Sequence, residues 1–256
     1  MNSLDLLAIA QNKSALSKLA EKFNIDLNDI PNMKKNLEKQ TIEEAQRQLK
    51  AKKSSWLWEN SVWSGDEPVK FEFSDWDITR QSDLSKAQGV LERSKVFARE
   101  LTEKAYNVVF YGNPGVGKTS LAIAILTELK NNGQSAMVIN TAELSSRISN
   151  SYIADDVRTV LYEVERGAKE CDVLLLDDFG TEAGNGQAMR IVRKDLQDFI
   201  YRVVNARAGK KTTIVTTNNT LKQLNAVYDR KIISRLITKD KNHEIIFSGF
   251  EDTRRI

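Results

Sequence analysis

The chain has 256 residues, of which 41% are hydrophobic and 29% charged, with a formal net charge of +3. This composition is typical of a soluble globular protein, and no apolar run reaches the roughly 18 residues needed to span a bilayer. A single cysteine excludes a disulfide within the chain, and a single histidine excludes a Cys/His zinc site. The first residues lack the basic start and small-residue cleavage site of a signal peptide, so a cytoplasmic location is expected. The mild positive charge permits contact with nucleic acid without requiring it.

Residues 1 to 65 are expected to form helices and a linker before the main domain. Apolar residues recur at helical spacing until segment 26–31 interrupts the pattern. Thr41 and Glu44 are spaced as a capping box, which predicts a charged helix from there to about Lys53. Three of the four tryptophans come next: Trp56, Trp58 and Trp63. They either form a binding patch or dock onto the main domain.

Residues 66 to 256 read as an alternation of helices and strands. Helices are expected over Ser82–Tyr106, Ser120–Lys130, Ala142–Tyr152, Asp155–Glu170 and Met189–Ala208. Strands are expected over Asn107–Tyr111, Ser135–Ile139, Val173–Leu176 and Thr212–Thr216. Such alternation predicts an α/β fold, with a parallel sheet flanked by helices.

The residues between the first expected strand and the next helix match the motif G-x-x-x-x-G-K-[ST] in full. They are Gly112, Asn113, Pro114, Gly115, Val116, Gly117, Lys118 and Thr119, followed by Ser120. Glycines let backbone N–H groups turn toward phosphate oxygens, and the next helix directs its positive dipole at the same anion. Lys118 is expected to reach the β and γ phosphates of ATP, and the Thr119 hydroxyl to bind Mg²⁺.

The second element of the site is the apolar run Val173–Leu176, which is followed by Asp177 and Asp178. Carboxylates at the carboxyl end of a buried strand face the crevice where parallel sheets bind ligands. Asp177 is expected to hold Mg²⁺ directly or through water, and Asp178 to polarise the attacking water. Two amides follow the last expected strand, where Asn218 and Asn219 either order that water or simply form a turn.

The order of these motifs resembles the AAA+ ATPases, and among them the bacterial or phage replicative-helicase loaders of the DnaC/DnaI type with their IstB-like relatives. The resemblance covers about residues 70 to 256 and rests on the runs YGNPGVGKTSLAIAI, LLLDDFG, TIVTTNN, DRKIISRL and GFEDTRR. It implies a AAA+ core over residues 66 to 256 that uses ATP and Mg²⁺ and hydrolyses ATP slowly. In these families the preceding region binds the hexameric helicase, so position alone assigns residues 1 to 65 that role.

The resemblance also implies roles for single residues. Asn218 looks like sensor 1, and Arg235 looks like the arginine finger that completes a neighbouring subunit's site. Arg254 looks like sensor 2, with Arg255 a close rival. A finger that acts on a neighbour implies an oligomer, because the site is shared across an interface. The segment Phe71–Trp76 resembles the strand-like lead-in beside the adenine.

The helix expected after the second strand resembles the helix with which the loaders line a path for single-stranded DNA. Arg147 suits contact with a phosphate there, and Tyr152 suits contact with a base. Arg190, Arg193 and Lys194 offer further positive charge. The alternative for each of these residues is a helical face that is simply solvated.

Two alternatives to a helicase loader stay open. A transposition regulator of the IstB type shares this core and would coat DNA and recruit a transposase. A non-hydrolysing helicase-binding switch or inhibitor is the other, because Asp178 stands where many AAA+ proteins carry a longer glutamate. An initiator of the DnaA type is not expected, since the sequence ends at Ile256, soon after Arg254.

Overall fold

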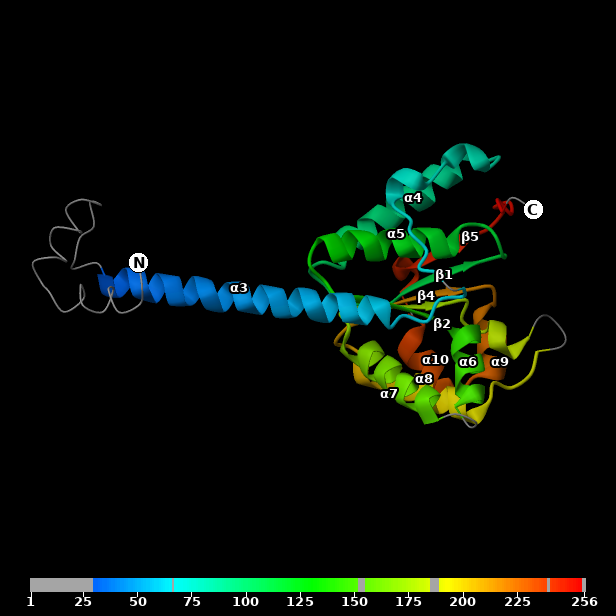
Figure 1. The fold of residues 1–256 in the computed structure, drawn as a ribbon. Helices are drawn as coiled ribbons and strands as arrows, with labels where there is room; N and C mark the ends of the chain where they lie inside the picture. The colour runs from blue at the N-terminus through cyan, green and yellow to red at the C-terminus, as the bar shows by residue number, and fades with distance from the viewer. Residues whose placement is uncertain (1–29, 66, 152–154, 185–188, 239, 255–256) are drawn as a thin grey trace, which may run out of the picture. The chain divides into compact units, whose positions relative to one another are not determined.

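A computed structural model describes residues 30–65, 67–151, 155–184, 189–238 and 240–254 (Figure 1). The chain divides into two compact units, the first ending at Lys52 and the second beginning at Lys53. The boundary expected at residue 65 therefore lies inside the second unit. Within the described ranges, no helix combines the length and the apolar character of a membrane span.

A five-stranded parallel sheet forms the centre of the second unit, in the order β2-β3-β4-β1-β5. Its strands are β1 (Val108–Gly112), β2 (Ala136–Asn140), β3 (Val173–Asp177), β4 (Thr212–Thr217) and β5 (Glu244–Phe247). Strands β2, β3 and β4 are buried along their whole length, as expected for strands covered on both faces. The shared direction brings the carboxyl ends of β1, β3 and β4 to one edge of the sheet.

Helices cover both faces of the sheet (Figure 1). One face carries α4 (Leu84–Glu100) and α5 (Lys118–Asn131). The other carries α6 (Thr141–Asn150), α7 (Asp155–Glu170), α8 (Lys194–Arg207), α9 (Leu221–Val227) and α10 (Arg230–Leu236). A separate apolar core fills each side. The expected α/β fold, a parallel sheet flanked by helices, is confirmed.

Helix α3 runs from Ile30 to Glu59, so the helix start expected at Thr41 is wrong. The Thr41 hydroxyl donates to the Leu37 carbonyl at 2.8 Å, a bond made by residues inside a helix. Pro31 accounts for the earlier start, because a proline has no N–H and is best tolerated in the first turn. The helical pattern expected before this point lies outside the described residues.

Three other expected elements differ from the structure. Helix α4 ends at Glu100, six residues before the expected end at Tyr106, and Leu101 closes it with an N–H that donates to the Phe97 carbonyl at 2.9 Å. The lead-in Phe71–Trp76 is no strand but contains the 3₁₀ helix η2 (Phe73–Asp75), because the Asp75 carboxylate accepts from the Glu72 N–H and closes a turn. Helix α8 begins at Lys194 rather than Met189. The backbone before it bonds elsewhere, with the Val192 N–H donating to the Val227 carbonyl at 3.0 Å.

The tryptophans at the end of α3 dock onto the core of the second unit. Trp63 is 8% exposed, and its ring meets that of Trp58 edge to face, with centroids 5.1 Å apart. Between α3 and Trp63, Val62 extends the sheet beyond β2. Its N–H donates to the Val138 carbonyl at 2.8 Å, and its carbonyl accepts from the Asn140 N–H at 2.7 Å. Trp58 and Trp63 therefore dock onto the main domain, which is one of the two alternatives expected for the tryptophans.

Candidate nucleotide-binding site

The glycine-rich motif forms the turn between β1 and α5. Gly115 and Gly117 have φ angles of 78° and 93°, in the left-handed region that glycine adopts without strain. Neither position has room for a side chain. A Cβ on Gly117 would lie 2.4 Å from the Trp76 ring, and one on Gly115 would lie 1.9 Å from an Asp252 carboxylate oxygen. Trp76 and Asp252 therefore support the loop from outside.

Lys118, the first residue of α5, is held at the carboxyl edge of the sheet and is 4% exposed. Its Nζ donates to the carbonyls of Gly112 (2.9 Å) and Asn113 (2.7 Å), and to Oδ1 of Asn218 at 2.8 Å. Burial lowers the pKa of Lys118 to about 8, although the charges of Asp178 and Asp177 oppose the shift. An ammonium held by neutral oxygens can exchange them for phosphate oxygens.

Asp177 ends β3 with a buried carboxylate that hydroxyl groups fix in place. The hydroxyls of Thr119 and Thr216 each donate to its Oδ1 at 2.7 Å, and the Asn140 amide donates to Oδ2 at 3.4 Å. Thr119 and Asp177 thus place two oxygen ligands side by side, as Mg²⁺ binding requires. Within the described ranges, no group of three or more His, Cys, Asp or Glu could hold a metal. A site for Mg²⁺ fits, since this ion takes few protein carboxylates and keeps phosphate and water ligands.

Asp178 has a φ of 54°. No other non-glycine residue among those described has a positive φ. A left-handed aspartate is strained, and its N–H is held by Thr216, whose Oγ1 accepts it at 2.9 Å. Burial raises the pKa of the Asp178 carboxyl and the Asp177 charge adds to this, whereas Lys118 opposes it. The backbone of Asp178 is therefore fixed, and its carboxyl has a raised affinity for a proton.

These groups open onto a cavity of about 460 Å³. The glycine-rich loop, Ser120, Asp178 and Asn218 line it together with Thr253 and Arg254. Asn219 is instead buried, with its amide nitrogen 2.4 Å from where a Cβ on Gly180 would lie. The structure therefore separates the two amides that the sequence left open and brings Asn218 into the cavity.

The C-terminal segment is fastened across the glycine-rich loop. The carbonyl of Gly115 accepts two hydrogen bonds from Thr253, one from its N–H at 3.0 Å and one from its hydroxyl at 3.1 Å. Arg254 lines the cavity and pairs with Asp252 at 2.6 Å. Arg255, the rival of Arg254, lies outside the described residues.

Arg235, on α10, does not line the cavity of its own chain. Its Nε donates to Oδ1 of Asn205 at 3.0 Å, and its Nη1 donates to the Lys231 carbonyl at 2.9 Å. Its guanidinium lies 5.3 Å from the centre of the Tyr201 ring. The position on a separate helix is compatible with action on a neighbouring subunit.

Arg147, expected to contact DNA, lies on α6 and pairs with Glu143 at 3.1 Å. Together with Trp63 it lines a second cavity of about 380 Å³ that contains none of the phosphate-site residues. Tyr152, its expected partner in DNA contact, lies outside the described residues.

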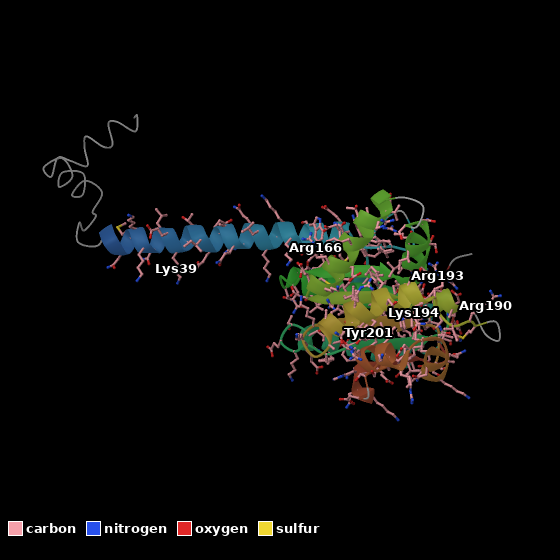
Figure 2. The ribbon with its side chains drawn as sticks, turned by 90° about the horizontal axis from the view of Figure 1, so that it is seen from below. Lys39, Arg166, Arg190, Arg193, Lys194 and Tyr201 are labelled. Atoms are coloured by element: carbon pink, nitrogen blue, oxygen red, sulfur yellow. The ribbon has the colours of Figure 1, made fainter. Side chains whose placement is uncertain are left out.

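Arg190, Arg193 and Lys194 lie before and at the start of α8, as Figure 2 shows. Arg190 is exposed. Arg193 and Lys194 form ion pairs with Asp195 and Asp198. These pairs neutralise part of the positive charge of the segment, and its contact with nucleic acid stays a prediction.

Several residues of the site belong to none of the sequence motifs. Asn140 and Thr216 hold Asp177 and lie at the ends of β2 and β4, so the rule that strand ends meet at one edge could have found them. Arg80 and Thr181 line the cavity from 3₁₀ turns, for which the sequence carries no recognisable signal.

The parallel sheet, the loop between β1 and α5 and the carboxylates after β3 define a P-loop nucleotide-binding protein. A sequence profile of the IstB-like ATP binding proteins matches residues 2–244, and the chain belongs to this family.

Curated relatives include the uncharacterised protein YdaV and the replicative helicase loader DnaC, both of Escherichia coli K12. YdaV is 27% identical over 176 residues, which are 68% of this chain and 65% of YdaV. DnaC is 22% identical over 147 residues, which are 57% of this chain and 56% of DnaC. The chain thus spans less than two thirds of the length of either relative.

Solved structures show the same fold. The crystal structure of DnaI superposes with a TM-score of 0.53 at 21% identity, over 72% of this chain and 91% of that one. The initiator DnaA, bound to AMPPCP and single-stranded DNA, superposes with a TM-score of 0.52 at 18% identity, over 70% of this chain and 50% of that one. These neighbours therefore share the fold of this chain over about 70% of its length.

Proposed function

We propose that this protein is an ATP-dependent loader of the replicative helicase onto single-stranded DNA. The observation that carries the proposal is the similarity to the helicase loader DnaC, which covers 57% of this chain. The AAA+ fold shared with DnaI supports it. In this proposal, residues 1 to 65 contain the surface that binds the helicase.

Nucleotide binding would rearrange the contacts of Lys118. Its ammonium gives up the carbonyls of the loop and the Asn218 amide for the β and γ phosphates of ATP. Asn218 is thereby released beside Asp178, where both can order and polarise the attacking water. Thr119 and Asp177 would hold Mg²⁺, whose positive charge would stabilise the phosphates. Arg254 leaves Asp252 for the terminal phosphate.

Assembly would complete the site. Arg235 of one subunit engages the nucleotide of its neighbour, and single-stranded DNA passes Arg147 and Arg190. A guanidinium fixed at the transferred phosphate accelerates phosphoryl transfer by about 10³–10⁵-fold in other systems. Hydrolysis is therefore expected to be slow in the isolated protein and faster in the complex with helicase and DNA.

Native mass spectrometry with the replicative helicase of the same organism, in the presence of ATP, tests the loader. The full chain and a chain beginning at Lys53 are compared, because the second unit begins there. A complex that forms with the full chain and is lost with the shortened one supports the proposal. A full chain that binds ATP but forms no complex with the helicase contradicts the proposal.

A second candidate is a transposition ATPase of the IstB type, which the match of residues 2–244 to the IstB-like family favours. This protein would form no complex with the helicase in that experiment, and it would form ATP-dependent polymers once DNA is added. A third candidate is a helicase-binding switch without turnover, favoured by the shorter carboxylate of Asp178. It would form the complex but release no phosphate even with helicase and DNA present.

A further inference from the structure

Arg80 lines the nucleotide cavity, although it belongs to no motif of the sequence. It ends the 3₁₀ turn η3 (Ile78–Arg80), close in sequence to Trp76, whose ring supports the P-loop. The Arg80 side chain is exposed and forms no ion pair within the described part of the chain. Its five N–H donors are therefore available to a ligand in the cavity.

The residue after Arg80 fixes its position. Gln81 is 6% exposed, and its amide pairs with the backbone of Glu251 in both directions. Nε2 donates to the Glu251 carbonyl at 3.0 Å, and Oε1 accepts from the Glu251 N–H at 2.8 Å. Two residues further, Thr253 bonds to Gly115 of the P-loop. One connection therefore holds Arg80 and the C-terminal segment at the same loop.

Arg254 lines the same cavity as Arg80. Burial dominates the shifted pKa values of Lys118 and Asp178, and the charge of Arg254 lowers both values. Arg254 therefore acts electrostatically on two residues of the phosphate site.

We propose that Arg80 is a nucleotide-binding residue whose guanidinium binds phosphate oxygens of the nucleotide in this cavity. A guanidinium presents parallel N–H donors that match two phosphate oxygens, and such charge-assisted bonds are the strong ones. Arg254 then supplies the part of the affinity that depends on the γ-phosphate. This inference rests on the proposed nucleotide site and does not depend on the loader role.

Equilibrium binding of Mg-ATP and Mg-ADP to the full chain, by titration calorimetry, tests the assignment. Arg80→Ala should weaken the binding of Mg-ATP about 10–100-fold, as expected for lost bonds between charged groups. Arg254→Ala should weaken ATP more than ADP. Arg99→Ala, an exposed arginine of α4 away from the cavity, is the control and should bind both nucleotides as the wild type does.

Arg80→Lys keeps the charge without the fork and should give an intermediate loss. It also serves if Arg80→Ala fails to fold, which circular dichroism would reveal. Wild-type affinity for both nucleotides in the folded Arg80 variants overturns the assignment. A wild-type chain that binds neither nucleotide would instead refute the nucleotide site itself.

Discussion

Glu182 is a carboxyl buried next to the nucleotide site with part of its hydrogen-bonding capacity unused. Its Oε2 lies 2.7 Å from the Thr141 hydroxyl, which is also 3.2 Å from the Asp178 carbonyl. Its Oε1 is buried without a partner among the described residues. Burial raises the pKa of Glu182, and the Asp178 charge adds to this effect. The folded protein therefore favours a neutral carboxyl at this position.

Glu182→Gln should make the free energy of unfolding less dependent on pH. A raised pKa in the folded state stabilises the wild type fully below the ordinary value of 4.5, and this contribution is lost as pH rises through the folded value. Glutamine stays neutral at every pH. The free energy of unfolding of the variant should therefore rise relative to that of the wild type between pH 5 and pH 8. Urea unfolding at both values measures the difference.

Glu103→Gln is the matched control, because Glu103 is exposed. It should leave the pH dependence of unfolding as in the wild type. If Glu182→Gln and the wild type lost the same stability between the two pH values, Glu182 would be ionised throughout.

At this scale, the sequence predicts residues whose chemistry is local to a motif. Lys118, Thr119 and Asp177 were found because the spacing of the P-loop and the end of a buried strand define their task without any tertiary contact. Arg80 was not found, because its place depends on the bond between Gln81 and Glu251, 170 residues apart in the chain. Side-chain pairs of this kind leave no periodic trace in a sequence.

Arg207, the last residue of α8, joins several elements at the amino ends of the strands. It is 1% exposed, and its Nη1 donates to the carbonyls of Ala168 (2.7 Å) and Cys171 (2.8 Å). Its Nε donates to the Thr213 hydroxyl at 3.1 Å, and its Nη2 donates to the Asp172 carbonyl at 3.1 Å. The end of α7, the start of β3 and the start of β4 are thus held by one side chain.

Arg207→Met should destabilise the protein by about 3 kcal/mol or more, since each bond from a charged group is worth about 1.5–3 kcal/mol. The methionine fills much of the volume but leaves several buried carbonyls without donors. Arg202→Met, on the same helix, removes an exposed ion pair with Glu165 and should cost at most about 1 kcal/mol. Chemical denaturation compares the two, and equal losses would show that Arg207 contributes no more than a surface charge.

The length of a helix or strand determines whether its pattern of apolar residues can be recognised in the sequence. Helix α5 has 14 residues with apolar positions throughout, and it was expected from its pattern. Strand β5 has four residues, of which only Ile245 and Phe247 are buried, too few to establish an alternation. Helices α9 and α10 have seven residues each and were missed for the same reason.

At the scale of the whole molecule, the proposed assembly lets Arg235 of one subunit and Lys118 of its neighbour act on the same nucleotide. Arg235→Ala should bind ATP as tightly as the wild type, because Arg235 does not line the cavity of its own chain. It should lose the hydrolysis stimulated by helicase and DNA. Lys118→Ala should lose ATP binding. Phosphate release and nucleotide titration measure the two effects.

Mixing these two variants tests the shared site directly. Where an intact cavity of the Arg235 variant meets the intact arginine of the Lys118 variant, hydrolysis should return in part. Normal stimulated hydrolysis by Arg235→Ala alone would remove its assignment as the finger.

The pairing of Val62 with β2 has a consequence for any shortened form of the protein. Without this segment, β2 would be the open margin of the sheet, with unpaired backbone donors and acceptors beside apolar side chains. Open margins of this kind recruit other strands and lead to aggregation. Removing residues 1 to 65 would also take Leu57 and Trp63 out of the core. Failure of such a fragment to bind a partner would then report self-association, whereas a fragment beginning at Lys53 keeps the pairing of Val62 with β2.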